Sequence, residues 1–275
     1  MEVCGTHTME IGRLGIRSLL PQQILLVSGP GCPVCVTPSS YIEQALKLVQ
    51  NSGNCLVTFG DMLHVPGKKE SLSFAKSKGA DVRVVTSPLQ LIEIAKEDSF
   101  KEFIFTSIGF ETTAPATARA VWLASRANLT NTSFLVAHRV VPPILEALLN
   151  DPDLSISGFL LPGHVSSIIG EIGYQVLKRH SIPGVITGFD SVDILSGILA
   201  LLHLLPEKSS SCVKNMYTRF VSPQGNSKAM ELIQSVYEPC DAILRGIGMV
   251  PRCGLKLKES YLNFDAQKKH GILVE

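Results

Sequence analysis

Short apolar runs alternate along this chain with stretches of helical periodicity, and this alternation constrains the fold more than any other feature. In the first helical stretch, Ile42, Leu46 and Val49 recur at helical spacing, and Ser40 followed by Glu43 predicts a capping box. Strands that are joined through helices form parallel sheets covered on both faces, so we predict an α/β protein. The apolar runs begin at Ile24, Cys55, Val82, Phe103, Phe134, Gly158 and Gly184.

The predicted strands are unevenly distributed, and this distribution suggests two lobes. Four strands lie between Cys55 and His138, enough for a small sheet, but only two are clear after residue 150. A strand at Ile24 and the segment before Cys4 would complete a second sheet. We therefore predict one lobe from residues 1–54 and 151–275 and a central lobe from residues 55–150, with a division in sequential order as the alternative.

The composition limits the cellular compartment in which the chain is expected and the kinds of molecule that it is expected to bind. Of 275 residues, 25 are Lys or Arg and 24 are Asp or Glu, which gives a net charge of +1. Nucleic acid and anionic membranes require a basic surface, so neither is expected as a partner. No apolar stretch is long enough to span a bilayer. The 7 cysteines are spread widely, unlike a disulfide framework, and this favours the reducing cytoplasm.

Nearly every predicted strand ends in a polar residue or a cysteine. Ligands of parallel α/β sheets bind at the carboxyl ends of the strands. These residues are therefore expected to line a cleft to which several strands contribute. They are Cys32 and Cys35, Asp61, Glu111, His138 and Arg139, His164, and Asp190 and Asp193.

The segment "GPGCPVC" places Cys32 and Cys35 at C-x-x-C spacing. Gly29 and Gly31 permit tight backbone turns, and Pro33 stiffens the loop between the thiols. A helix is expected to follow, and the dipole at its N-terminus would lower the pKa of a nearby thiol. The spacing is typical of a redox pair or of a metal site.

Cys4 and His7, in "CGTH", extend the set of potential ligands. With Cys32 and Cys35 they make a Cys3His inventory that suits structural zinc. They suit equally an iron site with a thiolate ligand beside a redox dithiol, and the spacing does not choose between the two. The other cysteines do not pair at ligand spacing and are interpreted as structural; they are Cys55, Cys212, Cys240 and Cys253.

With these residues assembled, the chain resembles the HypD family of [NiFe]-hydrogenase maturation factors. The resemblance implies two Rossmann-like lobes with parallel sheets and a cleft between them. It also implies a scaffold on which an iron atom receives cyanide and carbon monoxide, a HypC-type chaperone that shares the iron, and a HypE-type protein that delivers cyanide. The matching segments include "MEVCGTHTM", "SGPGCPVCVTP", "TFGDMLHVPG", "SIGFETTAP", "GFLLPGHVS" and "PGVITGFDSVDIL".

The resemblance assigns roles to individual residues. It implies that Cys4 is the iron ligand of an Fe(CN)2CO intermediate and that Cys32 and Cys35 form a redox-active dithiol. Asp61 and His164 stand at family motif positions and are expected to line the cleft and move protons, and His7 is a further candidate for cofactor binding. The expected protein is a scaffold with redox activity rather than a stand-alone enzyme.

The chain departs from the family pattern at both ends. Family members have an extension before the "CGTH" strand and a cysteine-rich C-terminal region that binds a [4Fe-4S] cluster, and this chain is expected to lack both. The alternatives to the scaffold are a thiol-disulfide oxidoreductase that uses Cys32 and Cys35, and a zinc-stabilised α/β protein that uses Cys4, His7, Cys32 and Cys35.

Overall fold

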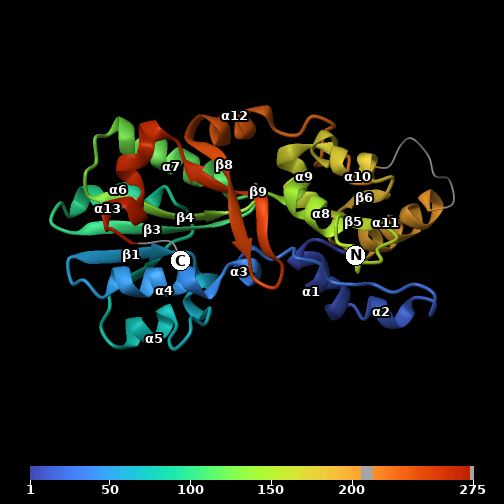
Figure 1. Ribbon diagram of the computed structural model, residues 1–275, viewed down its shortest axis with the longest axis horizontal. Helices are drawn as coiled ribbons and strands as arrows, with labels where there is room; N and C mark the ends of the chain where they lie inside the picture. The colour runs from blue at the N-terminus through green and yellow to red at the C-terminus, as the bar shows by residue number, and fades with distance from the viewer. Residues whose placement is uncertain (206–212, 273–275) are drawn as a thin grey trace. The chain divides into compact units, whose positions relative to one another are not determined.

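The computed structural model describes residues 1–205 and 213–272, and it is a mixed α/β structure with parallel sheets (Figure 1). The chain folds into two compact units, and it passes from one unit to the other three times. Unit 1 consists of Met1–Cys32 and Val141–Met230, and unit 2 consists of Pro33–Val140 and Glu231–Glu275.

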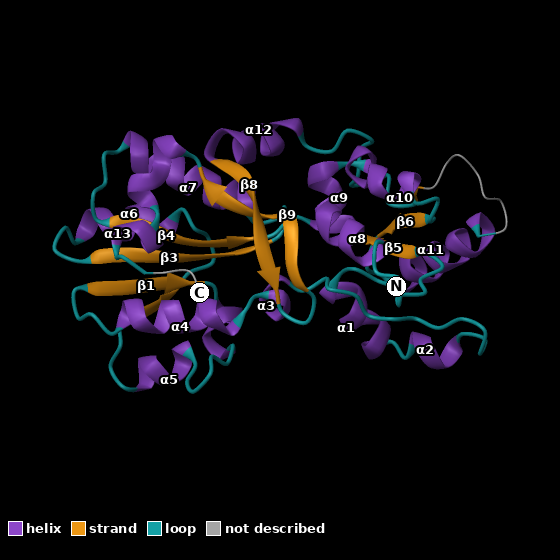
Figure 2. Ribbon diagram, viewed as in Figure 1, coloured by secondary structure: helices purple, strands orange, loops and turns teal. Residues whose placement is uncertain are grey.

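Unit 2 contains a four-stranded parallel sheet in the order β2-β1-β3-β4. The central strand β3 is buried at seven of its eight positions, as expected for a strand covered on both faces. The strands are β1 (Asn54–Thr58), β2 (Val82–Val84), β3 (Glu102–Gly109) and β4 (Thr132–His138) (Figure 2). The helices are α3 (Pro33–Val36), α4 (Ser39–Val49), α5 (Leu72–Ser77), α6 (Gln90–Glu97), α7 (Ala114–Arg126) and α13 (Ala266–Lys269), with 3-10 turns at Gly60–His64 and Glu259–Phe264.

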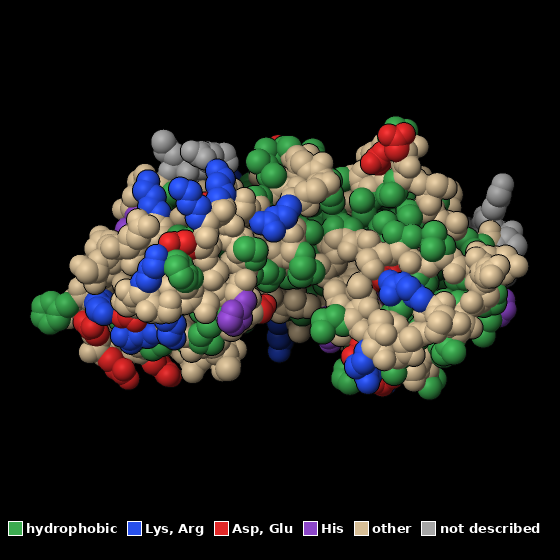
Figure 3. Space-filling model, turned by 90° about the horizontal axis from the view of Figure 1, so that it is seen from below, with side chains coloured by type: hydrophobic (Ala, Val, Ile, Leu, Met, Phe, Trp, Pro, Cys, Tyr) green, Lys and Arg blue, Asp and Glu red, His purple; other side chains and the backbone are tan. Residues whose placement is uncertain are grey.

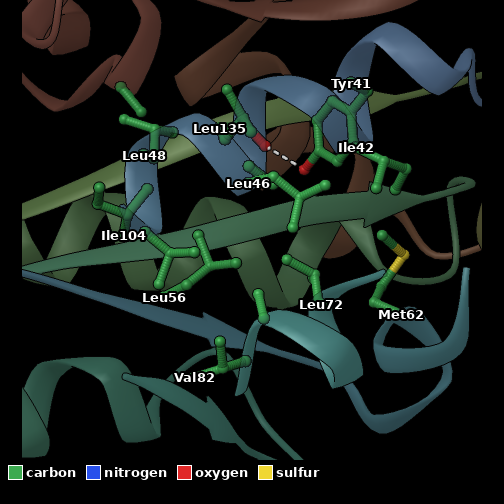
Figure 4. Packing of buried hydrophobic residues seen from close by; sticks show 14 of the residues in the cluster. Tyr41, Ile42, Leu46, Leu48, Leu56, Met62, Leu72, Val82, Ile104 and Leu135 are labelled. Atoms are coloured by element: carbon green, nitrogen blue, oxygen red, sulfur yellow. Dashed lines mark hydrogen bonds between the residues drawn. The ribbon is translucent and has the colours of Figure 1, made fainter. Parts of the chain in front are cut away.

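Alternate residues of this sheet face two different layers of side chains. Leu56, Ile104 and Leu135 pack with Ile42 and Leu46 of α4 in one hydrophobic cluster (Figure 4). Because side chains alternate along a strand, the neighbouring positions point to the opposite face. The α4 helix is fixed further by the Tyr41 hydroxyl, which donates to the carbonyl oxygen of Leu135 at 2.8 Å.

This core explains why the division of the chain differs from the predicted one. The sequence placed residues 1–54 and 151–275 in one lobe and residues 55–150 in the other. In the structure, α4 and the C-terminal residues Ala266 and Ile272 belong to the core of the central sheet. Segments 33–54 and 231–275 therefore belong to unit 2.

The start of α4 also differs from the prediction. The helix begins at Ser39, and Pro38 occupies the N-cap without a side-chain hydrogen bond. The Glu43 carboxylate accepts instead from the backbone N–H of Lys68. The predicted capping box of Ser40 and Glu43 is therefore wrong.

Unit 2 also contains an antiparallel hairpin that the sequence analysis did not find. It is formed by β8 (Tyr237–Leu244) and β9 (Gly248–Leu257), with an irregularity between Cys240 and Ala242. Gly246 in its turn and Gly248 at the start of β9 both have positive φ (83° and 106°). The hairpin follows α12 (Ser227–Val236) and packs on β4.

Unit 1 contains a three-stranded parallel sheet in the order β5-β6-β7. Glu2 extends this sheet through parallel bridges to Leu160 and Ser28, as expected for a strand that ends at "MEVC". Its buried carboxylate accepts from Arg17 and from the Ser28 hydroxyl, both at 2.8 Å. The strands are β5 (Phe159–Pro162), β6 (Gly184–Thr187) and β7 (Val213–Asn215).

The helices of unit 1 pack on this sheet through a small apolar core. Ile11 and Ile16 contact Leu160 of β5 and Ile194 and Ile198 of α11. The helices are α1 (Gly5–Arg13), α2 (Ile16–Leu19), α8 (Val141–Leu149), α9 (Gly163–Ile169), α10 (Gln175–Arg179) and α11 (Ser191–Leu204), with a 3-10 turn at Glu171–Tyr174.

Six of the seven predicted apolar strands are confirmed, and the one at Ile24 is wrong. Residues 24–27 form no strand, and Leu25 is 81% exposed. Only Ser28 has a bridge partner, because this segment lies at the edge of the sheet beside a single bridged residue, Glu2.

Length and hydropathy decide whether the helices of this chain could span a membrane. Across residues 1–205 and 213–272, no helix has both the length and the apolar character needed to cross a bilayer. On the face of unit 2 drawn in Figure 3, basic and acidic side chains lie intermixed, in keeping with the net charge of +1.

Candidate functional site

Cys4 lies where the N-terminal segment of unit 1 leaves the sheet. Its backbone is extended (φ −147°, ψ 125°), and α1 begins at the next residue, so Cys4 is the N-cap of that helix. The residue is 8% exposed and its thiol is free.

Two glycines hold the loop of Cys32 against Cys4. The N–H of Gly5 donates to the carbonyl oxygen of Gly31 at 2.8 Å. A Cβ atom on Gly31 would lie 2.2 Å from the backbone nitrogen of Cys4, and one on Gly5 would lie 3.4 Å from the Cβ of Cys32. Only glycine at position 31 allows the two backbones to approach this closely, so the glycines of "CGTH" and "GPGC" bring the two cysteine loops together.

Cys32 and Cys35 are both disulfide-bonded. Pro33 starts the short helix α3, which ends at Val36. Cys32 is half-buried and Cys35 is exposed. The boundary between the units falls between Cys32 and Pro33, so the C-x-x-C segment is also a covalent connection from unit 1 to unit 2.

Two imidazoles pack against the ring of Phe189, which follows β6. The ring of His164 stacks on Phe189 with 4.0 Å between centroids, and the ring of His7 lies 4.7 Å from it at 33°. His7 is on α1, and His164 is near the start of α9, directly after β5. The three rings therefore come from the carboxyl ends of three neighbouring segments of one sheet, where the sequence predicted polar groups to converge.

The hydrogen bonding of His7 defines its tautomer. Nε2 lies 2.8 Å from the carbonyl oxygen of Gly188, which can only accept, so we assign the proton to Nε2. Nδ1 then carries a lone pair, and it is buried with no hydrogen-bond partner. Burial lowers the pKa of His7 below its ordinary value, against smaller opposing effects from the Gly188 carbonyl and the Glu2 carboxylate. Burial also lowers the pKa of His164, so both imidazoles are neutral at pH 7.

The sequence analysis missed the aromatic part of this cluster. Tyr217, after β7, makes an edge contact with Phe189 at 6.3 Å between centroids. A Cβ atom on Gly163 would lie 2.8 Å from the ring of Tyr217, and one on Gly188 would lie 2.6 Å from it. The glycines of "PGH" and "TGF" are thus required by the close packing of Tyr217, and they were the signal available in the sequence.

The structure distributes the predicted site residues over both units. Cys4, His7, Cys32 and His164 lie in unit 1. Cys35 and Asp61 lie in unit 2, where Asp61 is exposed in the 3-10 turn that follows β1. Cys212 lies outside the described residues. Within residues 1–205 and 213–272, no three His, Cys, Asp or Glu side chains are grouped closely enough to hold a metal ion.

The fold and this site define an α/β protein with a free thiol, a disulfide-bonded C-x-x-C segment and neutral imidazoles at the edge of a parallel sheet. A family model named HypD and described as "Hydrogenase formation hypA family" matches residues 1–275. The chain belongs to the HypD family of hydrogenase maturation factors.

Curated relatives with this name come from several bacteria. The chain is 40% identical to the hydrogenase maturation factor HypD2 of Bradyrhizobium diazoefficiens over 97% of its length and 72% of the relative. It is 38% identical to HypD of Rhodobacter capsulatus, over 99% of the chain and 72% of the relative. It is also 38% identical to HypD of Escherichia coli K12, over 97% of the chain and 72% of the relative. The sequence-based assignment to this family is therefore confirmed.

Proposed function

We propose that this chain is the scaffold on which the Fe(CN)2CO group of a [NiFe]-hydrogenase is assembled, with Cys4 as the ligand that holds the iron. The observation that carries the proposal is the free thiol of Cys4 at the N-cap of α1, pressed against the loop of Cys32 by the contact at Gly31. The iron is the cargo of the scaffold, to be passed on with its ligands.

The chemistry of the donor supports this role. A cysteine thiolate is a soft ligand that suits Fe(II). A single cysteine leaves the remaining coordination positions of the iron open for cyanide, carbon monoxide and a ligand from a partner. We propose that a HypC-type chaperone supplies that ligand from its own cysteine, and that a HypE-type protein delivers the cyanide.

His7 and His164 are the proposed proton carriers in unit 1. Both imidazoles are neutral because burial lowers their pKa values, and a neutral imidazole can accept a proton. Among the residues that the structure describes, the buried Nδ1 of His7 has no hydrogen-bond partner, so its lone pair is free to accept a proton. Asp61 is proposed as a further acid on unit 2, from its place at the carboxyl end of β1.

Cys32 and Cys35 are the proposed redox pair. Oxidation of the dithiol forms one S–S bond and releases two electrons and two protons, and reduction reverses this. The disulfide-bonded state of both residues and the contact between Gly5 and Cys32 support a role beside the iron ligand. The family resemblance implies a [4Fe-4S] cluster as the source or acceptor of those electrons, and residues 254–275 contain no cysteine that could bind it.

The test is to purify the chain anaerobically with a HypC-type partner and record infrared bands of metal-bound CN and CO. We expect both bands in the wild type and in Cys240→Ala, which removes a free thiol of unit 2, and neither in Cys4→Ser. In Cys32→Ser, iron should still bind while assembly of the ligands stops. Bands that persist in Cys4→Ser would refute the role of Cys4.

The same preparations separate the two other interpretations. Stoichiometric zinc, with unfolding on chelation, would favour the zinc-stabilised protein. Reduction of a model disulfide without iron or partner, at the same rate in Cys4→Ser as in the wild type, would favour a free-standing oxidoreductase.

A further inference from the structure

Arg139 is a buried cation that forms no ion pair with the residues that the structure describes. It directly follows β4 in unit 2 and is 8% exposed. Its guanidinium donates from Nη1 to the carbonyl oxygen of His138 at 3.1 Å and from Nη2 to that of Ile243 at 3.3 Å, and Nε has no hydrogen-bond partner. Within the described residues, no ion pair includes Arg139.

A guanidinium in this position is costly to the folded protein. Arginine keeps its charge in proteins, and burial of a charge without a counter-ion opposes folding. Burial lowers the pKa of Arg139, and the groups that act in the opposite direction are the thiols of Cys253 and Cys240 and the hydroxyl of Tyr41 rather than a carboxylate. A buried charge that the protein leaves unpaired is explained if its partner is a ligand.

Arg139 lines a cavity of about 450 Å³ that lies within unit 2. A cavity of this volume is within the range that small molecules occupy. Its walls come from α4, β4, the β8–β9 hairpin and the start of α13, and the exposed residues Asp241, Met249 and Lys256 connect it to solvent. The apolar part of the lining is Pro38, Val136, Ala137, Ile243, Met249 and Leu255.

The other charged residues of the lining already have partners. Lys256 pairs with Glu238 at 3.0 Å, and Asp241 accepts from the backbone N–H of Arg252 at 2.9 Å. Asp265 caps α13 by accepting from the N–H of Gln267 at 2.9 Å. The unsatisfied charge of the cavity is therefore that of Arg139.

We propose that this cavity binds a small amphiphilic carboxylate, with its carboxylate on the guanidinium of Arg139 and its apolar part against Ala137, Ile243 and Leu255. The planar guanidinium matches a carboxylate in two parallel hydrogen bonds. A singly charged ligand fits better than a phosphate dianion, because Asp241 and Asp265 also line the cavity and would repel a second negative charge. The proposal concerns unit 2 alone and does not depend on iron chemistry at Cys4.

The test uses the 275-residue chain and three probes of similar shape: benzoate, its uncharged analogue benzamide, and phenyl phosphate. Binding is measured by calorimetric titration and by saturation-transfer NMR. We expect benzoate to bind at least about tenfold more tightly than either of the other probes, since a charge-assisted pair is replaced by a neutral contact or opposed by repulsion. Equal binding of benzoate and benzamide overturns the proposal, and stronger binding of phenyl phosphate overturns the choice of a carboxylate.

A pair of variants locates the binding. Arg139→Gln should weaken benzoate by at least about tenfold, while Arg245→Gln, which removes an exposed charge from the hairpin of the same unit, should leave it unchanged. Benzoate that binds Arg139→Gln as well as the wild type overturns the proposal. The comparison of probes on the wild type remains decisive if Arg139→Gln does not fold, because it needs no variant.

Discussion

The contact between Gly31 and Cys4 gives the sharpest test of how unit 1 is built. In Gly31→Ala, the new Cβ atom would lie 2.2 Å from the backbone nitrogen of Cys4, whereas an ordinary contact begins at 3.4 Å. The two loops must separate by roughly 1 Å, which costs about 1–3 kcal/mol as overpacking. The same separation weakens the 2.8 Å hydrogen bond from Gly5 to Gly31, at about 0.5–1.5 kcal/mol. We therefore expect a loss of about 2–4 kcal/mol in the free energy of opening of unit 1.

The assay should report on unit 1 alone, because a protein of two units need not unfold in one step. Alkylation of Cys4 in increasing urea, quantified by peptide mass spectrometry, measures the opening that exposes this buried thiol. Gly31→Ala should accelerate it, while alkylation of Cys55, buried in unit 2, stays unchanged. Gly12→Ala in α1 is the matched control, since its Cβ would meet nothing within 4 Å and alanine should stabilise the helix by about 0.5–1 kcal/mol. Equal rates at Cys4 in wild type and Gly31→Ala would refute this account of the loop contact.

Three further predictions concern His138, the hydroxyl pair of Thr106 and Thr58, and the partly desolvated imidazole of His164. Burial lowers the pKa of His138 to about 4, below about 6.5 in the unfolded chain, so unfolded protein binds more protons between these values and unit 2 should lose up to about 3 kcal/mol as pH falls from about 6.5 to about 4. Urea unfolding at several pH values should show this slope, and His138→Gln should flatten it. The hydroxyl of Thr106 donates to that of Thr58 at 2.6 Å with both residues buried, so Thr106→Val should cost about 1–2 kcal/mol in denaturation, and adding Thr58→Val should restore part of it rather than add to it. Phe189→Ala should raise the pKa of His164 in NMR titrations, because the ring that stacks on it at 4.0 Å would be replaced by water; an unchanged titration would show that Phe189 does not desolvate this imidazole.

The sequence predicted the parallel strands well and the hairpin not at all, for physical reasons. The strands from Cys55 to Gly184 are continuous apolar runs, and burial on both faces leaves a clear signal in the chain. The β8 strand alternates between exposed and half-buried positions and β9 is exposed at half of its positions, so neither is a continuous apolar run. They also contain Pro239 and Pro251, which argue against a strand. The glycines of "RGIG" were the usable sign of a turn.

The candidate site was predicted in its polar residues and missed in its aromatic ones. His164 was proposed because polar groups at strand ends converge on one edge of a sheet, whereas Cys4 and His7 were proposed from the segment "CGTH". Phe189 was not singled out, since a sequence does not show that two imidazoles pack against the same ring. The unit boundaries were missed because the packing of α4 on the central sheet is a tertiary contact that the local pattern of its residues does not encode.

The bridge between Glu2 and Leu160 has a consequence for how the chain is made on the ribosome. Glu2 cannot form its bridge until Leu160 has been synthesised, which is 158 residues later. At roughly 5–20 residues per second, this takes on the order of 10–30 s, during which the thiol of Cys4 cannot be buried by native contacts with β5. The core of unit 2 likewise cannot be completed before Ala266 has been synthesised, because Ala266 belongs to that core. Both units must therefore complete their folding late in translation, and a nascent chain halted before residue 159 would carry Cys4 in a form open to oxidation and to chaperones.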